Sequence, residues 1–413
     1  MLQLRMIKYS DLPLWVCVGV LIVISFFLIY GATFTMLQKA DFDTLYFVKK
    51  HLVSLIIGII GLLLFLYLDY KYLKSVSFPF YLFMIFVLIG VIFIGYESQG
   101  AQRWLSIGPF SFQPSEFGKM SLILILAKYF ENTKSSLESF SDLIIPSIIA
   151  GIPFLLIFKQ PDLGTALVSL AIFFGMLLWA KANTTLILFL FTPLISMIFS
   201  LAIFWWIIYV VALFVTLYII RMKLFDFIII FASNLALGLG TPFVWATLQD
   251  YQKTRILSFL NPGIDPLGAG YHSLQSQIAV GSGGFFGRGF LHGTQTALQF
   301  IPKQWMDFIF SVVGEEFGFV GSVFILIVFL VIIWRGIIIA MTARDYFGTL
   351  IAGGIISMYT FHVMVNIGMT LGIMPVVGIP LPFLSFGGSA LLINLICIGI
   401  LQSIAMRRHK IFF

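Results

Sequence analysis

Long runs of apolar residues, separated by short polar segments, fill the chain from beginning to end. A helix needs roughly 20 mostly apolar residues to cross the hydrocarbon core of a bilayer, and about twelve runs approach this length. The pattern predicts an all-α, polytopic integral membrane bundle that forms one domain over residues 1–413. The helices are expected near residues 14–34, 51–69, 77–96, 114–130, 143–158, 163–180, 184–201, 204–220, 225–247, 309–334, 346–370 and 388–405.

The runs at 184–201 and 204–220 are the hardest to separate, because no polar turn divides them and only the Trp205–Trp206 pair marks the boundary. Tryptophan favours membrane interfaces, so we interpret these runs as a hydrophobic hairpin over about 184–220. The bundle then has about 10 to 12 spans, depending on whether both runs cross. No small-residue cleavage signature follows the first run, which is therefore expected to be a retained helix and not a signal peptide.

The amino-acid composition also predicts a membrane protein. The chain is 60% hydrophobic and only 10% charged, whereas a soluble domain usually carries about 25% charged residues. Water cannot surround so much apolar surface on a folded chain, so the bilayer must be part of the solvent. Cys17 and Cys397 lie in apolar runs at opposite ends of the chain, and they predict no disulfide framework.

The positive residues indicate the orientation. With the N-terminus inside, most of them flank helices at inner loops, as the positive-inside rule expects. The net charge of +7 then reflects topology, with anionic lipid as a further partner, and predicts no nucleic-acid partner. Both termini would be cytoplasmic, and the long loop at about 248–308 would be periplasmic. The inner positive residues are Arg5, Lys8, Lys71, Lys74, Lys128, Lys134, Lys181, Arg221, Lys223, Arg335, Arg344, Arg407, Arg408 and Lys410.

The first outward segment with polar residues is GAQRWLSIGPFSFQPSEFGK, residues 100–119. Its aromatic residues alternate with polar ones, which predicts a segment lying along the membrane interface. QPSE suits the start of a helix, and a Glu116–Lys119 ion pair would explain those two charges structurally. The functional alternative is that Arg103 and Lys119 bind an anionic headgroup.

Two shorter outward segments also break the apolar pattern. In KQPDLGTAL, Asp162 lies where a span begins, so it suits a helix N-cap. A charge at membrane depth usually has a partner or faces a cavity, and Lys159 is the expected partner. The prolines and glycines of residues 372–392 predict a packed re-entrant turn, because non-helical backbone at this depth must be covered by protein or by a water-filled cavity.

The glycine-dense GSGGFFGRG around Arg288 is a weak phosphate signal, because it lacks the spacing of a phosphate-binding loop and follows no strand. Asp307, Glu315 and Glu316 open the next span, but a straight helix would turn Glu316 away from Asp307. These acids therefore predict no metal cluster, and the histidines show no ligand spacing. The residues specify no cofactor, and a divalent cation such as Mg²⁺ or Mn²⁺ remains open.

The stretch FLNPGIDPLGAGYHS, residues 259–273, places Asp265 in a turn fixed by prolines and glycines. Asp265 either stabilises its own loop or accepts a proton at the membrane surface, where partial burial would raise its pKa. The residues alone indicate chemistry on a phosphorylated lipid, or its transport. Nearby candidates for binding such a lipid are Lys253, Arg255, Gln275 and Arg288.

Five segments together resemble the SEDS family (shape, elongation, division, sporulation). They cover nearly the whole chain in order, and DPLGAGYH and GTQTALQF resemble the rod-shape elongation branch more than the division branch. The segments are GAQRWLSIG…QPSEFGK, KQPDLGTAL, NPGIDPLGAGYHSLQSQIAVGSGGFFGRGFLHGTQ, FIPKQWMDFIFSVVGEEFGFVG and PFLSFGGSALL.

This resemblance implies a peptidoglycan glycosyltransferase that polymerises lipid II at the outer face of the bacterial inner membrane. It also implies as partners a class B penicillin-binding protein, which is a transpeptidase, and membrane proteins of the elongation complex. The family's catalytic aspartate falls on Asp265, where it would be the general base, with undecaprenyl diphosphate as leaving group. The other family motifs fall on Arg103 and Trp104, on residues 113–119, and on Asp162.

Two departures from the family pattern stand out. The family has about ten spans, so the hairpin at about 184–220 looks like an insertion, and an even number of added spans leaves Asp265 outside. KQWMDF replaces a run that in the family is often more acidic or contains histidine, which weakens any role for Asp307. A lipid II flippase and a non-catalytic scaffold for the transpeptidase are the alternative functions, since broken helices and polar residues at membrane depth suit a transporter too.

Overall fold

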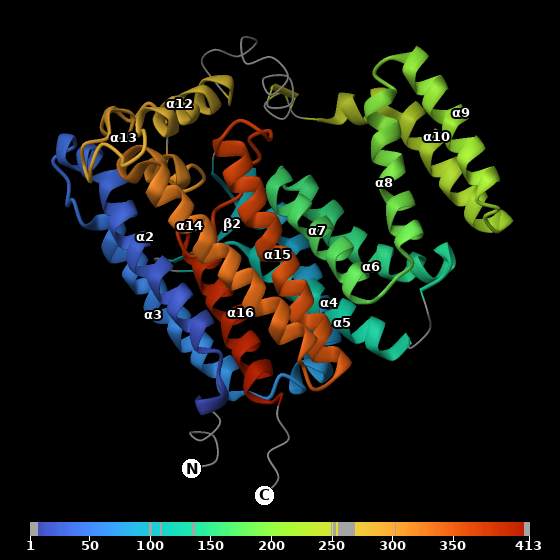
Figure 1. Ribbon diagram of the computed structural model, residues 1–413, viewed down its shortest axis with the longest axis horizontal. Coiled ribbons are helices and arrows are strands. Elements are labelled where there is room, and N and C mark those ends of the chain that lie inside the picture. Colours follow the sequence, from blue (N-terminus) through green and yellow to red (C-terminus); the bar gives the residue numbers. More distant parts are fainter. Residues whose placement is uncertain are drawn as a thin grey trace, which may run out of the picture.

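The computed structural model describes residues 7–98, 101–107, 110–133, 137–248, 250, 253–254, 269–301 and 303–408, and it has a helix at each of the twelve predicted runs (Figure 1). Within this part of the chain, eight helices are long and apolar enough to span a membrane, and α7, α8 and α9 are shorter apolar helices. The prediction of an all-α polytopic membrane protein is confirmed. The twelve helices are α2 (Leu12–Lys39), α3 (Tyr46–Tyr67), α4 (Tyr72–Ile94), α5 (Pro114–Thr133), α6 (Phe140–Lys159), α7 (Leu163–Trp179), α8 (Thr184–Phe199), α9 (Ile203–Ile219), α10 (Leu224–Thr247), α14 (Ile309–Met341), α15 (Tyr346–Thr370) and α16 (Gly388–Met406).

The segment between α4 and α5 forms a small antiparallel sheet. Its strands β1 (Tyr96–Ser98), β2 (Ala101–Ile107) and β3 (Phe110–Phe112) pair in that order, with Leu105 opposite Phe112. The alternation of aromatic and polar residues has the two-residue period of a strand, and this explains the local structure. The sheet leads directly into α5, so it brings β2 next to the start of that helix.

The predicted long loop contains two described helices, α12 (Ala269–Ser282) and α13 (Thr294–Leu298). Figure 1 shows both at the end of the bundle opposite to the start of α2 and the end of α16. We call the end with α12 and α13 the outer end, following the orientation expected from the positive residues. A short 3-10 helix, η1 (Ile7–Tyr9), precedes α2 at the inner end.

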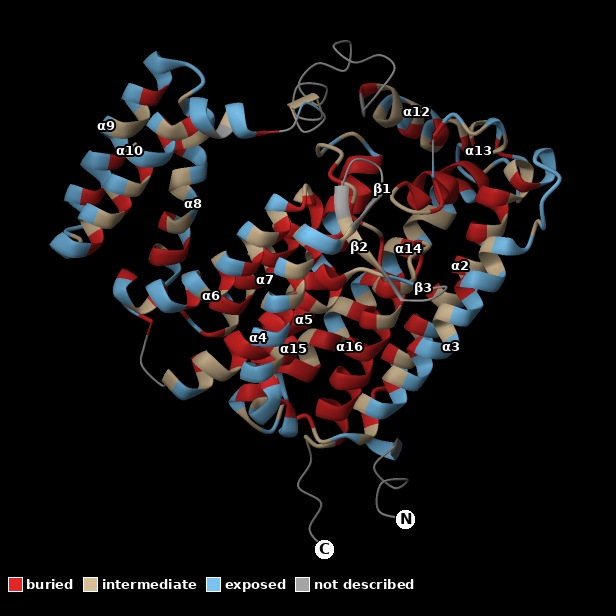
Figure 2. Cartoon of the chain, turned by 180° about the vertical axis from the view of Figure 1, so that it is seen from behind, coloured by how far each residue is buried: buried red, intermediate tan, exposed pale blue. Residues whose placement is uncertain are grey.

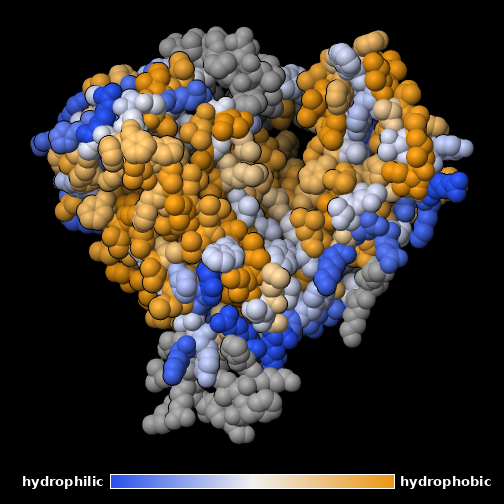
Figure 3. Space-filling model, in the orientation of Figure 1, coloured by the Kyte–Doolittle hydropathy of each residue, from blue (hydrophilic) through white to orange (hydrophobic). Residues whose placement is uncertain are grey.

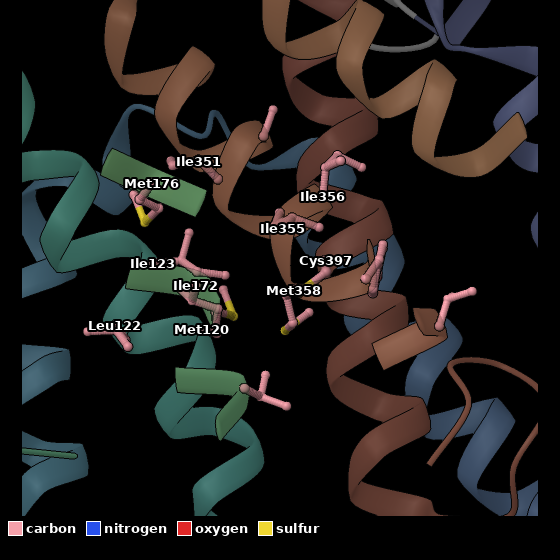
Figure 4. Packing of buried hydrophobic residues seen from close by; sticks show 14 of the residues in the cluster. Met120, Leu122, Ile123, Ile172, Met176, Ile351, Ile355, Ile356, Met358 and Cys397 are labelled. Atoms are coloured by element: carbon pink, nitrogen blue, oxygen red, sulfur yellow. The ribbon is translucent and has the colours of Figure 1, made fainter. Parts of the chain in front are cut away.

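Helices α15 and α16 form the centre of the main bundle. In their most apolar stretches 78% and 89% of the residues are buried, against 22% to 39% in the other long spans. Buried residues gather around these two helices (Figure 2), and Ile351, Ile355 and Met358 of α15 pack among side chains of α5 and α7 (Figure 4). Gly399 lets α16 approach α3 closely, because a Cβ there would lie 2.5 Å from the Leu62 carbonyl oxygen.

Helices α8, α9 and α10 lie together at one side of the molecule (Figure 1). Polar side chains join them inside the apolar surroundings: Asn234 Nδ2 donates to Thr192 Oγ1 at 2.9 Å, and Tyr209 Oη donates to Asn234 Oδ1 at 3.0 Å. Trp205 is exposed, as an interface residue would be, whereas Trp206 is buried and donates to Ser196 Oγ. The two tryptophans therefore differ, although the sequence suggested one role for both.

The surface is apolar over the middle of the molecule and polar toward the inner end (Figure 3). Polar contacts tie helix ends together there. Arg335 Nε donates to Asp11 Oδ1 at 3.0 Å, and Gln402 Nε2 donates to the Asp11 carbonyl at 2.9 Å. Tyr70 donates to Asp345, and its burial together with this carboxylate raises the pKa of the phenol. These contacts close the bundle at the end opposite to the predicted site.

Candidate functional site

Asp162 is the centre of a polar cluster at the outer end of the bundle. It is the N-cap of α7, where its Oδ1 accepts from the Thr165 backbone N–H at 3.3 Å and its Oδ2 accepts from Thr165 Oγ1 at 3.0 Å. Gln113, at the junction of β3 and α5, donates its Nε2 to Asp162 Oδ2 at 2.9 Å. The carboxylate is only 3% exposed, so it fixes the start of α7 against the start of α5.

Arg103 on β2 completes this cluster. Its Nη1 lies 3.5 Å from Asp162 Oδ1, and its side chain is 25% exposed. The cation beside Asp162 is therefore Arg103, and the prediction of Lys159 was wrong. Lys159 is exposed at the end of α6, while the small sheet returns β2 to the start of α7. Trp104, the next residue on β2, is half-buried.

The guanidinium of Arg103 makes few polar contacts with the described residues. Its Nε is buried and has no hydrogen-bond partner among the described residues, and its single carboxylate contact is long. Arginine presents five N–H donors in a planar fork that matches phosphate geometry. Arg103 is thus a fixed cation with donors to spare, which suits a phosphate-bearing ligand.

The start of α16 and the re-entrant segment join the same cluster. Ser389 Oγ accepts from the Gln113 backbone N–H at 3.0 Å and donates to the Ser111 carbonyl at 3.4 Å. A Cβ at Gly164, the second residue of α7, would lie 2.7 Å from the Val377 carbonyl oxygen, so α7 begins directly against the segment 372–387. That segment is non-helical, and most of its residues are buried or half-buried, as expected of a packed re-entrant turn.

Lys119 lies deeper than the Arg103–Asp162 cluster. Its side chain is 2% exposed, and its ammonium lies 2.8 Å from Glu116 Oε2 and donates to His362 Nε2 at 3.3 Å. The ion pair offered as the structural explanation of these charges is present. Lys119 is thus already neutralised by a buried acid, and it belongs to the support beneath the cluster more than to the surface that a headgroup would meet.

The glycine-dense segment packs against a kink in α14. Gly318 has φ +66° inside that helix, and a Cβ there would lie 2.3 Å from the Gly287 nitrogen. The backbone N–H groups of Arg288 and Gly289 donate to the carbonyls of Glu315 and Glu316 at 3.0 Å each. These amides are used within the protein, so the weak phosphate signal has a structural explanation.

Glu315, on α14, caps the N-terminal end of α13. Its carboxylate accepts from the backbone N–H groups of Gln295 at 2.7 Å and Thr296 at 2.9 Å, and it is fully buried. The Arg288 side chain is exposed and donates to Thr294 Oγ1 at 3.0 Å. Among the described residues, no three His, Cys, Asp or Glu side chains are grouped so as to hold a metal ion.

Several predicted residues lie away from the cluster or outside the described part of the chain. Gln275 is half-buried on α12, and in the described ranges no hydrogen bond or ion pair joins Gln275 or Arg288 to Asp162. Asp265 and Arg255 fall outside the described residues. Sequence reasoning missed His362, because a lone histidine in an apolar run gives no spacing signal that separates a site residue from a structural one.

The chain matches a known family over nearly its whole length. The family model for FtsW, RodA and SpoVE, described as cell cycle protein, matches residues 11–209 and 205–410. The peptidoglycan glycosyltransferase RodA of Treponema pallidum is 36% identical over 390 residues, which are 87% of this chain and 89% of the relative. The peptidoglycan glycosyltransferase MrdB of Escherichia coli is 38% identical over 333 residues, which are 80% of this chain and 78% of the relative.

Solved structures share the fold. One, described as "Structural coordination of polymerization and crosslinking by a peptidoglycan synthase complex", superposes with a TM-score of 0.71 at 27% identity, over 97% of this chain and 99% of that one. The crystal structure of the rod shape determining protein RodA of Thermus thermophilus superposes with a TM-score of 0.64 at 23% identity, over 97% of this chain and 98% of that one.

Proposed function

Because this chain belongs to the FtsW/RodA/SpoVE family, also called SEDS, we propose that it is a peptidoglycan glycosyltransferase that polymerises lipid II during cell elongation. The observation that carries the site is the Arg103–Asp162–Gln113 cluster, which joins three of the family's motifs in one place and leaves Arg103 Nε without a hydrogen-bond partner among the described residues. A fixed cation with free donors at the outer end is what a lipid diphosphate requires.

The proposed reaction is a single displacement with Asp265 as general base. Asp265 takes the proton from the 4-hydroxyl of the acceptor GlcNAc, and that oxygen forms a bond to the anomeric carbon of the donor MurNAc. The bond from this carbon to the diphosphate oxygen breaks, and undecaprenyl diphosphate leaves with the electron pair. A diphosphate leaves without protonation, so one carboxylate suffices, unlike the pair used by glycosidases.

The protein's main contribution is positioning and electrostatic stabilisation of the leaving group. Arg103 suits this role, because its side chain is partly exposed and Asp162 holds it in place. Arg255 and Arg288 remain candidates for a second contact, as do Trp104 and Gln275 for the sugar or lipid. A divalent cation beside the leaving diphosphate is tested by titrating the polymerisation rate with Mg²⁺ and Mn²⁺.

We further propose a bacterial inner-membrane location with both termini in the cytoplasm and the cluster facing the periplasm. The proposed partner is a class B penicillin-binding protein, together with membrane proteins of the elongation complex. The neighbour described as a peptidoglycan synthase complex supports a transpeptidase partner. The hairpin of α8 and α9 is proposed as an insertion into the family's pattern of about ten spans.

The decisive test uses the purified full chain in liposomes that contain lipid II, with both glycan polymer and flipped lipid measured. Asp265→Asn is expected to abolish polymerisation while the protein stays folded, because the amide cannot accept the proton. Asp250→Asn is the matched control, since Asp250 is a fully exposed acid near the start of the same loop. Normal glycan synthesis by Asp265→Asn refutes the assignment of the base, and lipid transfer without polymer identifies a flippase.

A further inference from the structure

Helix α15 carries two buried polar side chains that face the re-entrant segment. His362 is 4% exposed and Asn366 is 0% exposed, and their spacing of four residues places them on one face of the helix. His362 Nδ1 lies 3.0 Å from the Pro380 carbonyl oxygen, and Asn366 Nδ2 donates to the Ile379 carbonyl at 2.7 Å. Asn366 Nδ2 also donates to the Asp307 carbonyl at 2.8 Å. One face of α15 therefore binds the backbone of the re-entrant segment and the backbone just before α14.

The partners of His362 determine which ring nitrogen carries the hydrogen. A backbone carbonyl can only accept, so Nδ1 is the protonated nitrogen and donates to Pro380 O. Nε2 is then left with a lone pair, and Lys119 Nζ donates to it at 3.3 Å. The imidazole is neutral in this arrangement, because a proton on Nε2 would face the lysine ammonium directly.

The lysine that His362 contacts belongs to a fully desolvated ion pair. Lys119 is 2% exposed and Glu116 is 3% exposed, with 2.8 Å between Lys119 Nζ and Glu116 Oε2. A buried charge that loses a partner is strongly unfavourable, so every acceptor around such an ammonium matters. Among the described residues, removing the Nε2 lone pair would leave Glu116 as the one remaining acceptor for Lys119.

This buried group lies further along α5 than the Arg103–Asp162 cluster, below its level in the bundle. Lys119 follows Gln113 by six positions, which is about 9 Å along a helix at 1.5 Å per residue, and Gln113 donates to Asp162. From the other side, Pro380 follows closely on Val377, whose carbonyl lies against Gly164 at the start of α7. His362 thus connects the two supports of the cluster, α5 and the re-entrant segment, through one ring.

We propose that His362 is a positioning residue for glycan polymerisation, acting through Lys119 and the Pro380 carbonyl to hold α5 and the re-entrant segment in register beneath Arg103. The inference rests on the proposed function and extends it to a residue that does not touch substrate. Misplacement of a reacting group by about 1 Å can cost about 10²-fold in rate. The effect of losing His362 should therefore appear in kcat while substrate binding changes little.

The test compares three variants of the full chain in liposomes with lipid II. His362→Leu removes both contacts and should lower kcat by about 10²-fold with KM little changed. His362→Gln should restore most of kcat, because its amide can donate to Pro380 O and accept from Lys119. His51→Leu is the matched control: His51 is also buried, at 1% exposure, but it bonds to Ser25 on α2 and should leave kcat near that of the unchanged protein.

The folded fraction of each variant is measured by thermal unfolding in detergent. A folded His362→Leu with normal kcat overturns the inference, and so does a folded His362→Gln that is no better than His362→Leu. If His362→Leu does not fold, His362→Phe replaces it, since it keeps a ring without nitrogen atoms, and the same comparison with His362→Gln decides. Failure of the unchanged protein to polymerise lipid II would refute the proposed function and this inference with it, whereas a folded His362→Leu with normal kcat refutes the inference alone.

Discussion

Asp162 combines a structural role and a site role in one carboxylate, and the two can be separated by substitution. Asp162→Ala removes the N-cap of α7, which usually costs about 0.5–2 kcal/mol, and it also leaves Gln113 and Arg103 without their acceptor. Asp162→Asn keeps an oxygen for the Thr165 N–H but removes the negative charge beside Arg103. We expect thermal unfolding in detergent to rank the unchanged protein, Asp162→Asn and Asp162→Ala in decreasing stability.

Polymerisation should fall in both Asp162 variants, because Arg103 loses the charge that holds its guanidinium. An Asp162→Ala variant as stable as the unchanged protein would contradict the capping role. Full activity in a folded Asp162→Asn variant would contradict the role of the ion pair.

Single residues were predictable from the sequence where local geometry decides their role. Asp162 was expected as an N-cap, and Glu116 and Lys119 as an ion pair three positions apart, and both contacts are present. The pairing of Asp162 with Arg103 depends on how the small sheet brings β2 to the start of α7, so nearness in sequence wrongly favoured Lys159. His362 finds its partner 243 positions earlier in the chain, and no local pattern reports such a contact.

At the scale of elements, alanine should destabilise the protein to different extents at two glycines of the glycine-dense segment. Gly287 has φ +83°, and a Cβ there would lie 2.1 Å from the Glu316 carbonyl oxygen, whereas Gly284 has φ +60° and nothing within 4 Å. Gly284→Ala should cost only the left-handed backbone strain of about 1–2 kcal/mol. Gly287→Ala should destabilise the protein more, because the backbone of α14 must also move. Thermal unfolding of the two variants in detergent checks this order.

Gly19→Ala in α2 is the control for those glycine variants. It meets nothing within 4 Å and lies in ordinary helical backbone, so its unfolding temperature should match or slightly exceed that of the unchanged protein. Equal stability of Gly284→Ala and Gly287→Ala would contradict the close packing against α14.

The helices of this chain could be predicted from the apolar runs, because length and hydropathy are local properties. The kink at Gly318 could not, since it depends on the backbone of residues 284–287 lying against α14. The same holds for the small sheet, whose short strands gain pairing partners only when β1, β2 and β3 meet. The sequence thus predicted the spans and the non-helical segment before α16, but it did not predict the kink in α14 or the small sheet.

At the scale of the whole molecule, the even number of helices between the termini brings the start of α2 and the end of α16 to one end of the bundle, opposite α12 and α13 (Figure 1). Inner loops rich in lysine and arginine agree with this arrangement. A periplasmic active site requires this sidedness, which hydropathy alone does not determine.

Single cysteines can test the sidedness in intact cells. Lys303→Cys lies just before α14 at the outer end, whereas Lys181→Cys and Arg221→Cys lie in the turns after α7 and α9 at the proposed inner side, and all three native side chains are exposed. A membrane-impermeant maleimide should label Lys303→Cys alone before lysis and all three afterwards. Cys17 and Cys397 lie within helices α2 and α16, so the unchanged protein gives the background. Labelling of Lys181→Cys before lysis would place the Arg103–Asp162 cluster on the cytoplasmic side and exclude polymerisation at the outer face.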